Sequence, residues 1–316
     1  MEDYPKTLME FESRFSTEGV CREYLAGLRW PGGFRCPRCG YGKAWRARKT
    51  LYECGRCGHQ VSVTAGTIFQ GPHKPLRTWF RAIWLVTSQK PGVSAVGLRA
   101  TLGLGSYRTA WVWLHKLRRA MVRPGRDRLS GRIEVDETYF GGRSEGHEGR
   151  RGGDKALIVI AAQEDGRKIG RIRMQRVANA SARSLEPFIT GAVEPGSVIH
   201  TDGWSGYAGL KALGYLHEST PQKRLDVPGA EEDLLPRVHR VVSLLKRWVM
   251  GTHQGSVSHE HLDCYLDEFT FRFNRRTSQH RGKLFYRLMQ QAVNVAPTKY
   301  ADLVMNVRGR GKHNRK

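Results

Sequence analysis

The sequence predicts a multidomain α/β protein, and three observations lead to that prediction. The chain has 316 residues, which is enough for about two domains. Residues 31–71 are rich in glycine and cysteine, and residues 74–122 carry apolar side chains at helical spacing. From residue 131 the apolar period changes to two, as expected for strands. Strands followed by alternating strands and helices are typical of an α/β domain with a mixed sheet.

The composition indicates a folded protein with a polyanionic partner. Hydrophobic residues make up 39% of the chain, which is too many for a disordered protein. Lys and Arg number 53 against 29 Asp and Glu, a formal net charge of +24. Such a surplus opposes compactness unless a partner neutralises it, so we expect DNA or RNA. No apolar run approaches the length of about 18 residues that spans a bilayer, and the first residues lack the order of a signal peptide. We therefore expect a cytoplasmic protein that binds no membrane.

The first 122 residues divide into three parts. Residues 1–30 carry mixed charge and scattered apolar side chains, which predicts a helical lead-in, and residues 31–71 contain short strand-like runs. Residues 74–122 show helical periodicity on both sides of a turn marked by Gly103 and Gly105. This pattern predicts a small basic bundle similar to a helix-turn-helix. We expect its tryptophans to be core residues rather than base-stacking ones: Trp79, Trp84, Trp111 and Trp113.

Four cysteines form two C-x-x-C pairs. Cys36 and Cys39 make the first, Cys54 and Cys57 make the second, and each pair is followed by glycine. Two such knuckles close a tetrahedral site of the kind that Zn²⁺ occupies in structural sites. A disulfide does not suit the expected compartment, and a redox C-x-x-C needs no second copy. The sequence therefore predicts a Cys₄ ribbon with structural zinc over residues 31–71. The other two cysteines are interpreted as ordinary semi-buried thiols: Cys21 and Cys264.

The region from residue 131 to residue 300 is predicted to form the α/β domain. Strands are predicted at residues 132–140, 156–162, 169–176 and 197–201, with a turn at residues 164–168. Helices are predicted at residues 181–191, 203–213, 237–250 and 259–274. Residues 214–230 have little pattern and are expected to loop out, and residues 301–316 form a basic tail.

Acidic residues lie in or directly after two of these predicted strands. Glu134, Asp136 and Glu137 belong to the first strand, and Asp202 follows the strand at residues 197–201. Burial of a carboxylate costs desolvation unless the group binds something. Residues 134 and 136 of a strand share one face, and residue 137 points to the other. Acids on the sheet of a basic protein indicate divalent-metal chemistry on phosphodiesters. The alternative is helix N-capping for Asp202 and surface exposure for Glu134 and Glu137.

These motifs resemble those of a known family. The Cys₄ ribbon is followed by VDETYFGG, HTDGWSGY, SLLKRWVMGTH and HLDCYLDEFTFRFNRR. Together they are similar to insertion-sequence transposases with an N-terminal zinc ribbon and an ISXO-type DDE domain, over residues 11–274. The resemblance implies a ribonuclease-H-like catalytic fold in residues 131–300, whose acids hold two Mg²⁺ or Mn²⁺ ions. It places the first acid at Asp136 and the second at Asp202.

The third position departs from the family pattern, which has a Glu and, seven residues later, a Lys or Arg. Alignment on SLLKR places His239 and Lys246 at these positions. Both then project from one helix face, beside an apolar stripe that is expected to be buried. The resemblance therefore implies an Asp-Asp-His site, with Lys246 holding a phosphate near the scissile bond. The residues of the apolar stripe are Val238, Val241, Val242, Leu245 and Val249.

In this Asp-Asp-His arrangement Asp136 bridges both ions, and Asp202 and His239 complete one each. Imidazole is a poorer ligand for Mg²⁺ than for Mn²⁺. His239 is interpreted as a ligand or a general base. Two alternatives remain open at the third position: the enzyme is inactive, or a ligand comes from a nearby acidic cluster. That cluster consists of Glu231, Glu232 and Asp233.

The resemblance implies a DNA transposase that binds terminal inverted repeats, cleaves the element ends and joins the 3′ ends to target DNA. It also implies a homodimer or higher oligomer on DNA, and a nucleoid-associated location. Rival interpretations are an inactive DNA-binding repressor, a ribonuclease-H-like nuclease or resolvase, and a zinc-ribbon RNA-binding factor. Besides Lys246, the expected DNA contacts are Arg99, Arg108, Lys116, Arg118 and Arg119. Ribbon arginines that are either phosphate contacts or a solvated face are Arg35, Arg38, Arg46, Arg48 and Arg56.

Overall fold

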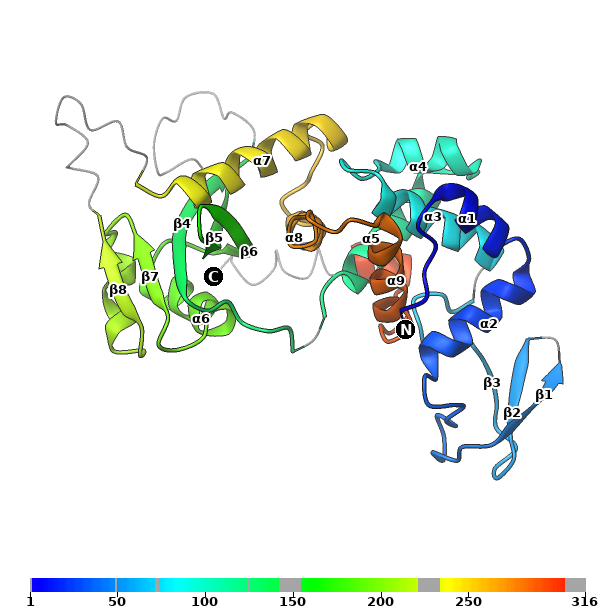
Figure 1. Cartoon of the computed structure of the whole chain (residues 1–316). Helices are drawn as coiled ribbons and strands as arrows, with labels where there is room; N and C mark the ends of the chain where they lie inside the picture. Colours follow the sequence, from blue (N-terminus) through cyan, green and yellow to red (C-terminus); the bar gives the residue numbers. More distant parts are fainter. Residues whose placement is uncertain are drawn as a thin grey trace. The chain divides into compact units, whose positions relative to one another are not determined.

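The chain forms two compact units in a computed structural model (Figure 1). The structure describes residues 2–48, 50–71, 74–123, 125–141, 155–220 and 234–304. The first unit combines residues 1–123 with residues 277–316, and the second comprises residues 124–276. Among the described residues, no helix has both the length and the apolarity required to cross a bilayer.

The first unit begins with two short helices and a three-stranded ribbon. Helices α1 (Leu8–Arg14) and α2 (Glu18–Arg29) each start at a threonine, Thr7 or Thr17, whose side chain accepts a backbone N–H of the first turn. The ribbon is antiparallel in the order β1-β2-β3. Its strands are β1 (Ala44–Arg48), β2 (Leu51–Cys54) and β3 (Gln60–Ser62).

Three consecutive helices follow the ribbon, where helical periodicity predicted them. They are α3 (Leu76–Ser88), α4 (Ala95–Leu102) and α5 (Tyr107–Ala120). Gly103 ends α4 with a φ of 60°, a left-handed conformation that suits glycine. Ser106 then caps α5 by accepting the Thr109 N–H. The turn expected at Gly103 is confirmed.

Helix α9 (Arg281–Ala292) comes from the far end of the chain and packs on α3. Its Phe285 is fully buried and lies with its ring centroid 5.5 Å from that of Phe11 and 5.9 Å from those of Phe80 and Trp84. The catalytic domain had been predicted to continue to residue 300, but its compact unit ends at residue 276. The physical reason is this aromatic core, which returns the C-terminal helix to the first unit.

The second unit is built on a five-stranded mixed sheet with the order β6-β5-β4-β7-β8. The hairpins β4–β5 and β5–β6 are antiparallel, whereas β4–β7 and β7–β8 are parallel. This arrangement confirms the mixed sheet and is consistent with a ribonuclease-H-like fold. The strands are β4 (Arg132–Phe140), β5 (Ala156–Asp165), β6 (Lys168–Val177), β7 (Val198–Thr201) and β8 (Leu216–Ser219).

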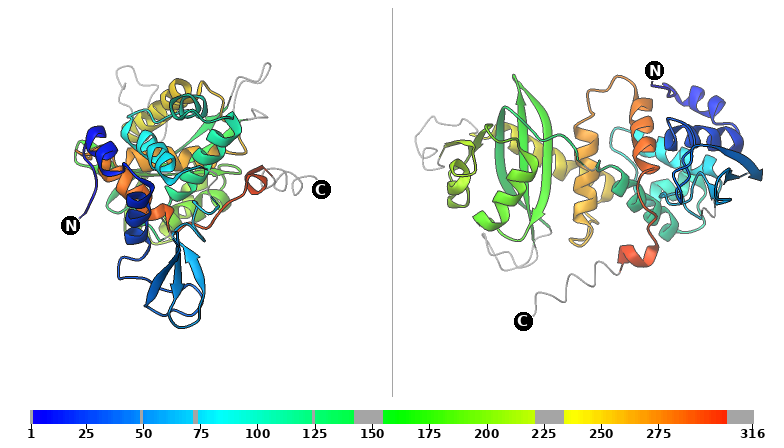
Figure 2. Two further views of the ribbon diagram at one scale, coloured as in Figure 1. Left: turned by 90° about the vertical axis from the view of Figure 1, so that its right-hand side faces the viewer. Right: turned by 90° about the horizontal axis from the view of Figure 1, so that it is seen from below.

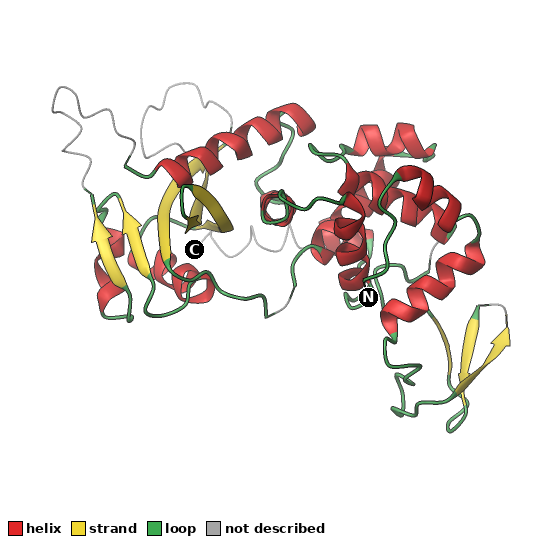
Figure 3. Ribbon diagram, in the orientation of Figure 1, coloured by secondary structure: helices red, strands yellow, loops and turns green. Residues whose placement is uncertain are grey.

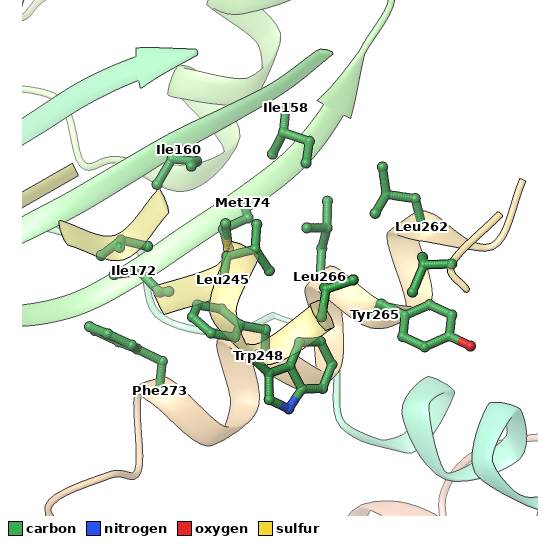
Figure 4. Close-up of a cluster of buried hydrophobic side chains, with 14 of the residues drawn as sticks. Ile158, Ile160, Ile172, Met174, Leu245, Trp248, Leu262, Tyr265, Leu266 and Phe273 are labelled. Atoms are coloured by element: carbon green, nitrogen blue, oxygen red, sulfur yellow. The ribbon is translucent and has the colours of Figure 1, made fainter. Parts of the chain in front are cut away.

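Helices cover both faces of this sheet, as the colouring of Figure 3 and the views of Figure 2 show. On one face α6 (Ala182–Ala192) and a 3₁₀ helix, η1 (Ser205–Lys211), pack on the odd-numbered side chains of β4. On the other face lie α7 (Pro236–His253) and α8 (Leu262–Phe273). Figure 4 shows Leu245 and Trp248 of α7 and Leu266 of α8 in the same buried cluster as Ile158 and Ile160 of β5.

The predicted elements of this unit agree with the structure, with two exceptions. The α-helix predicted at residues 203–213 is instead the 3₁₀ helix η1, Ser205–Lys211. The segment expected to loop out contains the edge strand β8, which pairs with β7 in parallel. Strand β8 has four residues and mostly exposed side chains, so it lacks the apolar pattern that marks a buried strand.

Candidate active site

The parallel register of β4 and β7 brings two predicted site residues to the same end of the sheet. Ile133 pairs with Ile199 and Glu134 with His200. Asp136 lies two residues after Glu134 on β4, and Asp202 lies two residues after His200. Because β4 and β7 are parallel neighbours, the two acids lie at the same end of the sheet. Here β7 ends at Thr201 while β4 continues to Phe140, which leaves Asp202 on the loop that follows.

Both acids line one cavity of about 830 Å³ at this end of the sheet. The segment from Asn179 to Ala182, at the start of α6, forms part of its lining. The loop after β7 contributes Trp204, whose indole N–H donates to the Ala180 carbonyl at 2.7 Å. Gly206 lies so close to this carbonyl that a Cβ atom there would approach it to 2.4 Å. The cavity beside the acids therefore has a tightly packed wall.

Helix α7 brings the third predicted residue beside the first acid. His239 lies in its first turn, and its Nε2 is 3.4 Å from Oδ2 of Asp136. The side chain of His239 is 49% exposed and that of Asp136 is 18% exposed. The predicted apolar stripe of α7 packs on the sheet, and Lys246 is exposed. The amphipathic reading of this helix is confirmed.

The neighbouring acids have different environments from those that the alternative interpretation assumed. Glu134 is 1% exposed and accepts hydrogen bonds from the start of α7. Glu137 points to the other face of the sheet and accepts the hydroxyl of Tyr207 at 2.6 Å. Burial, aided by the Glu137 charge, raises the pKa of Tyr207 well above its usual value, so this phenol stays a donor. Surface exposure was the wrong alternative for Glu134.

Asp202 has a local hydrogen bond as well as a place in the cavity. Its Oδ1 accepts the Trp204 N–H at 2.9 Å, which is the local contact of an Asx turn. The 3₁₀ helix η1 has Trp204 at its N-cap and no side-chain capping bond. N-capping was therefore the wrong alternative for Asp202.

The donor set suits a divalent cation. Neighbouring ligands of an octahedral ion at about 2.1 Å are about 3 Å apart, close to the separation of the His239 and Asp136 donors. Within the described ranges, however, only the four cysteines bring three or more potential ligand atoms within 4.8 Å of one another. Asp136, Asp202 and His239 therefore share one end of the sheet without forming a closed ligand cluster.

The four predicted zinc ligands converge in the ribbon. The Sγ atoms of Cys36 and Cys57 are 3.7 Å apart, and those of Cys39 and Cys54 are 3.6 Å apart. A tetrahedral zinc with bonds of about 2.3 Å requires sulfurs about 3.8 Å apart, so the residues fit the ion.

Each knuckle bends at the glycine that follows its second cysteine. Gly40 has a φ of 73° and donates to the Cys36 carbonyl, and Gly58 has a φ of 64° and donates to the Cys54 carbonyl. In the second knuckle, the Arg56 N–H points to the Cys54 sulfur at 3.5 Å. The left-handed backbone explains why glycine occupies both positions.

Comparison with known proteins agrees with both sites. Residues 128–274 match the ISXO2-like transposase domain, and residues 16–60 match the transposase zinc-ribbon domain. By these matches the chain is similar to transposases that carry an ISXO2-like domain behind a zinc ribbon. The resemblance deduced from the motifs is thereby confirmed. A curated relative, described as an uncharacterized protein in transposable element ISH50 of Halobacterium salinarum, is 26% identical over 284 residues, which cover 82% of this chain and 91% of the relative.

The residues expected to contact DNA differ widely in exposure. Arg99, Arg108 and Arg119 are exposed, and the Arg108 guanidinium stacks 3.5 Å from the ring centre of Tyr300. Lys116 is half-buried, and burial lowers its pKa. Arg118 is only 1% exposed, so it is placed too deep for the phosphate or base contact expected of it. Helical periodicity had not distinguished the buried from the exposed basic positions of α5.

The tryptophans of the helices before the transposase domain are core residues, as expected, with one intermediate case. Trp79, Trp84 and Trp113 are at most 6% exposed, and the rings of Trp79 and Trp113 stack at 3.8 Å. Trp111 is half-buried and its ring lies 6.2 Å from that of Tyr300. Cys21 is buried and Cys264 is half-buried.

Several expectations fall outside the described residues. The acidic cluster proposed as an alternative source of the third ligand lies there, and so does most of the basic tail. Sequence reasoning also missed the cavity wall around Trp204 and the contact of Glu134 with α7. The close approach of Gly206 to Ala180 had one possible signal in the sequence, which is the glycine that follows Trp204 and Ser205.

Proposed function

We propose that the protein is a DNA transposase that cleaves the ends of its element and joins the resulting 3′ ends to target DNA. The observation that carries the proposal is the meeting of Asp136 and Asp202 in one cavity, with His239 beside Asp136. The transposase domain and its zinc ribbon support the same reading. Both chemical steps are displacements at phosphorus, first by water and then by the freed 3′ hydroxyl.

The proposed roles follow from the position of each side chain. Asp136 and Asp202 supply oxygen ligands, and His239 supplies a nitrogen ligand at the exposed side of Asp136. Bound divalent ions would provide positive charge to the attacking and leaving oxygens. Lys246 lies on the exposed side of α7, where its ammonium group can hold a DNA phosphate. Arg99, Arg108 and Arg119 remain the proposed contacts to the terminal repeats.

The test is a cleavage and strand-transfer assay with duplexes that carry the inverted repeats flanking the gene. We expect Asp136→Asn, Asp202→Asn and His239→Ala to reduce cleavage at least 1000-fold, on the order of the loss of an essential catalytic group, while duplex binding persists. Asp165→Asn is the matched control, because Asp165 is an exposed carboxylate at the β5–β6 turn. Cleavage by wild type should be faster with Mn²⁺ than with Mg²⁺, and His239→Glu should shift this preference towards Mg²⁺.

Other results would favour the rival functions. Wild-type binding to the element ends without divalent-dependent cleavage would support a DNA-binding repressor. Cleavage of branched DNA that ignores the repeat sequence would support a resolvase-like nuclease. Full activity of His239→Ala would move the third ligand elsewhere, with the acids at residues 231–233 as the next variants.

A further inference from the structure

Helix α7 is capped by a residue of the sheet instead of by its own sequence. Leu235, at the N-cap position, makes no side-chain capping bond, and Pro236 at the first position has no N–H to donate. The next two N–H groups, of Arg237 and Val238, donate to Oε2 of Glu134 at 2.7 and 2.9 Å. A β4 carboxylate therefore satisfies the N-terminal donors that a helix leaves open.

The side chain of Arg237 in α7 also binds Glu134. Nη1 of Arg237 donates to Oε1 of Glu134 at 2.8 Å and lies 3.0 Å from Glu164 of β5. Its Nη2 donates to the Gly166 carbonyl at 2.9 Å. Glu134 is 1% exposed and accepts three hydrogen bonds, two from the helix end and one charge-assisted. These bonds fix the start of α7 against strand β4.

The contact between Glu134 and Arg237 lies two residues before a candidate metal ligand on each of the two elements. Glu134 precedes Asp136 by two residues, on the same face of β4, and Arg237 precedes His239 by two residues on α7. We propose that Glu134 is a positioning residue, which sets the distance between Asp136 and His239 and thereby the affinity of the site for a divalent cation. This inference rests on the proposed function, because it requires Asp136 and His239 to be ligands.

A second buried ion pair of the same unit provides a matched control. Glu268 is 1% exposed, and its Oε1 lies 2.8 Å from Nη2 of Arg272. Both residues belong to α8 and are four positions apart, on a helix that carries none of the three candidate ligands. Loss of either carboxylate charge should destabilise the unit, but only Glu134→Gln should change metal binding.

The experiment measures Mn²⁺ binding to the zinc-loaded full chain without DNA, by electron paramagnetic resonance of free Mn²⁺. Wild type, Glu134→Gln, Glu268→Gln and Asp136→Asn are compared, and thermal unfolding is recorded for each. We expect Glu134→Gln to weaken Mn²⁺ binding at least about tenfold, the usual effect of removing a group that orients a metal ligand. Glu268→Gln should stay within about twofold of wild type, because it orients no ligand.

The outcomes separate the positioning role from the metal site itself. Equal Mn²⁺ affinity for Glu134→Gln and Glu268→Gln, with binding lost in Asp136→Asn, would overturn the positioning role alone. Unchanged binding in Asp136→Asn would overturn the metal site. Should Glu134→Gln not fold, Arg237→Gln takes its place, because it removes a side-chain bond and leaves both helix N–H contacts to Glu134. It should still weaken Mn²⁺ binding more than Glu268→Gln does.

Discussion

The two candidate metal sites of this chain are assembled in different ways. All four sulfurs of the ribbon come from residues 36–57, and each knuckle bends at one glycine with a left-handed backbone, Gly40 or Gly58. The three catalytic candidates come from β4, the loop after β7 and helix α7. The first site therefore depends on local geometry and on the ion, whereas the second depends on strand register and helix docking.

The largest difference between the two sites should appear when a zinc ligand is removed. Cys54→Ser should lose the single zinc and unfold residues 31–71, because zinc binding supplies most of the folding free energy of a small ribbon, on the order of 10 kcal/mol. The transposase domain should stay folded. Metal analysis and limited proteolysis check both statements, and Cys264→Ser is the control that keeps zinc. Retention of zinc by Cys54→Ser would show that the four sulfurs are not the binding site.

A pair of glycine substitutions compares local and tertiary constraint directly. Gly206→Ala places a Cβ against the Ala180 carbonyl and should destabilise the transposase domain by about 1–3 kcal/mol, the usual cost of overpacking. Slower end cleavage should accompany this loss, because the wall beside Asp202 shifts. Gly58→Ala meets no atom within 4 Å and should cost only about 1 kcal/mol of left-handed strain. Urea unfolding of each variant measures both values, and a smaller loss for Gly206→Ala than for Gly58→Ala contradicts the comparison.

The site built on distant elements belongs to a unit whose stability should depend on pH through Asp267 of α8. Burial raises the pKa of Asp267 of α8 from 3.8 to about 7. The charge of Arg126 lowers this pKa, and the charge of Asp263 raises it. The carboxyl group of Asp267 therefore binds its proton more tightly in the folded state than in the unfolded state. The free energy of unfolding should fall as the pH rises from 4 to 7.

Asp267→Asn removes this dependence. It should be neutral near pH 4 and should stabilise the transposase domain by about 1–2 kcal/mol at pH 8. Thermal unfolding at both pH values measures the change. Equal effects at pH 4 and pH 8 would show that the carboxyl titrates normally.

The sequence predicted the local features of the molecule well. The C-x-x-C spacing identified the four cysteines that cluster in the ribbon, because a knuckle is made by residues close together in the chain. Period-two and helical patterns located most strands and helices of the sheet unit, and the stripe through Val238 and Leu245 identified the buried face of α7. These signals exist in one sequence because they reflect contacts between neighbours along the chain.

Only the tertiary structure decided which distant residues meet. The parallel pairing of β4 with β7 brings Asp136 and Asp202 to the lining of one cavity, and the docking of α7 brings His239 to Asp136. Phe285 packs in the aromatic core of the first unit. The sequence left Glu134 as one of the acids of the sheet or as a surface residue, but its position beneath α7 makes it a cap. Register and docking depend on how whole faces pack, and no local pattern records that choice.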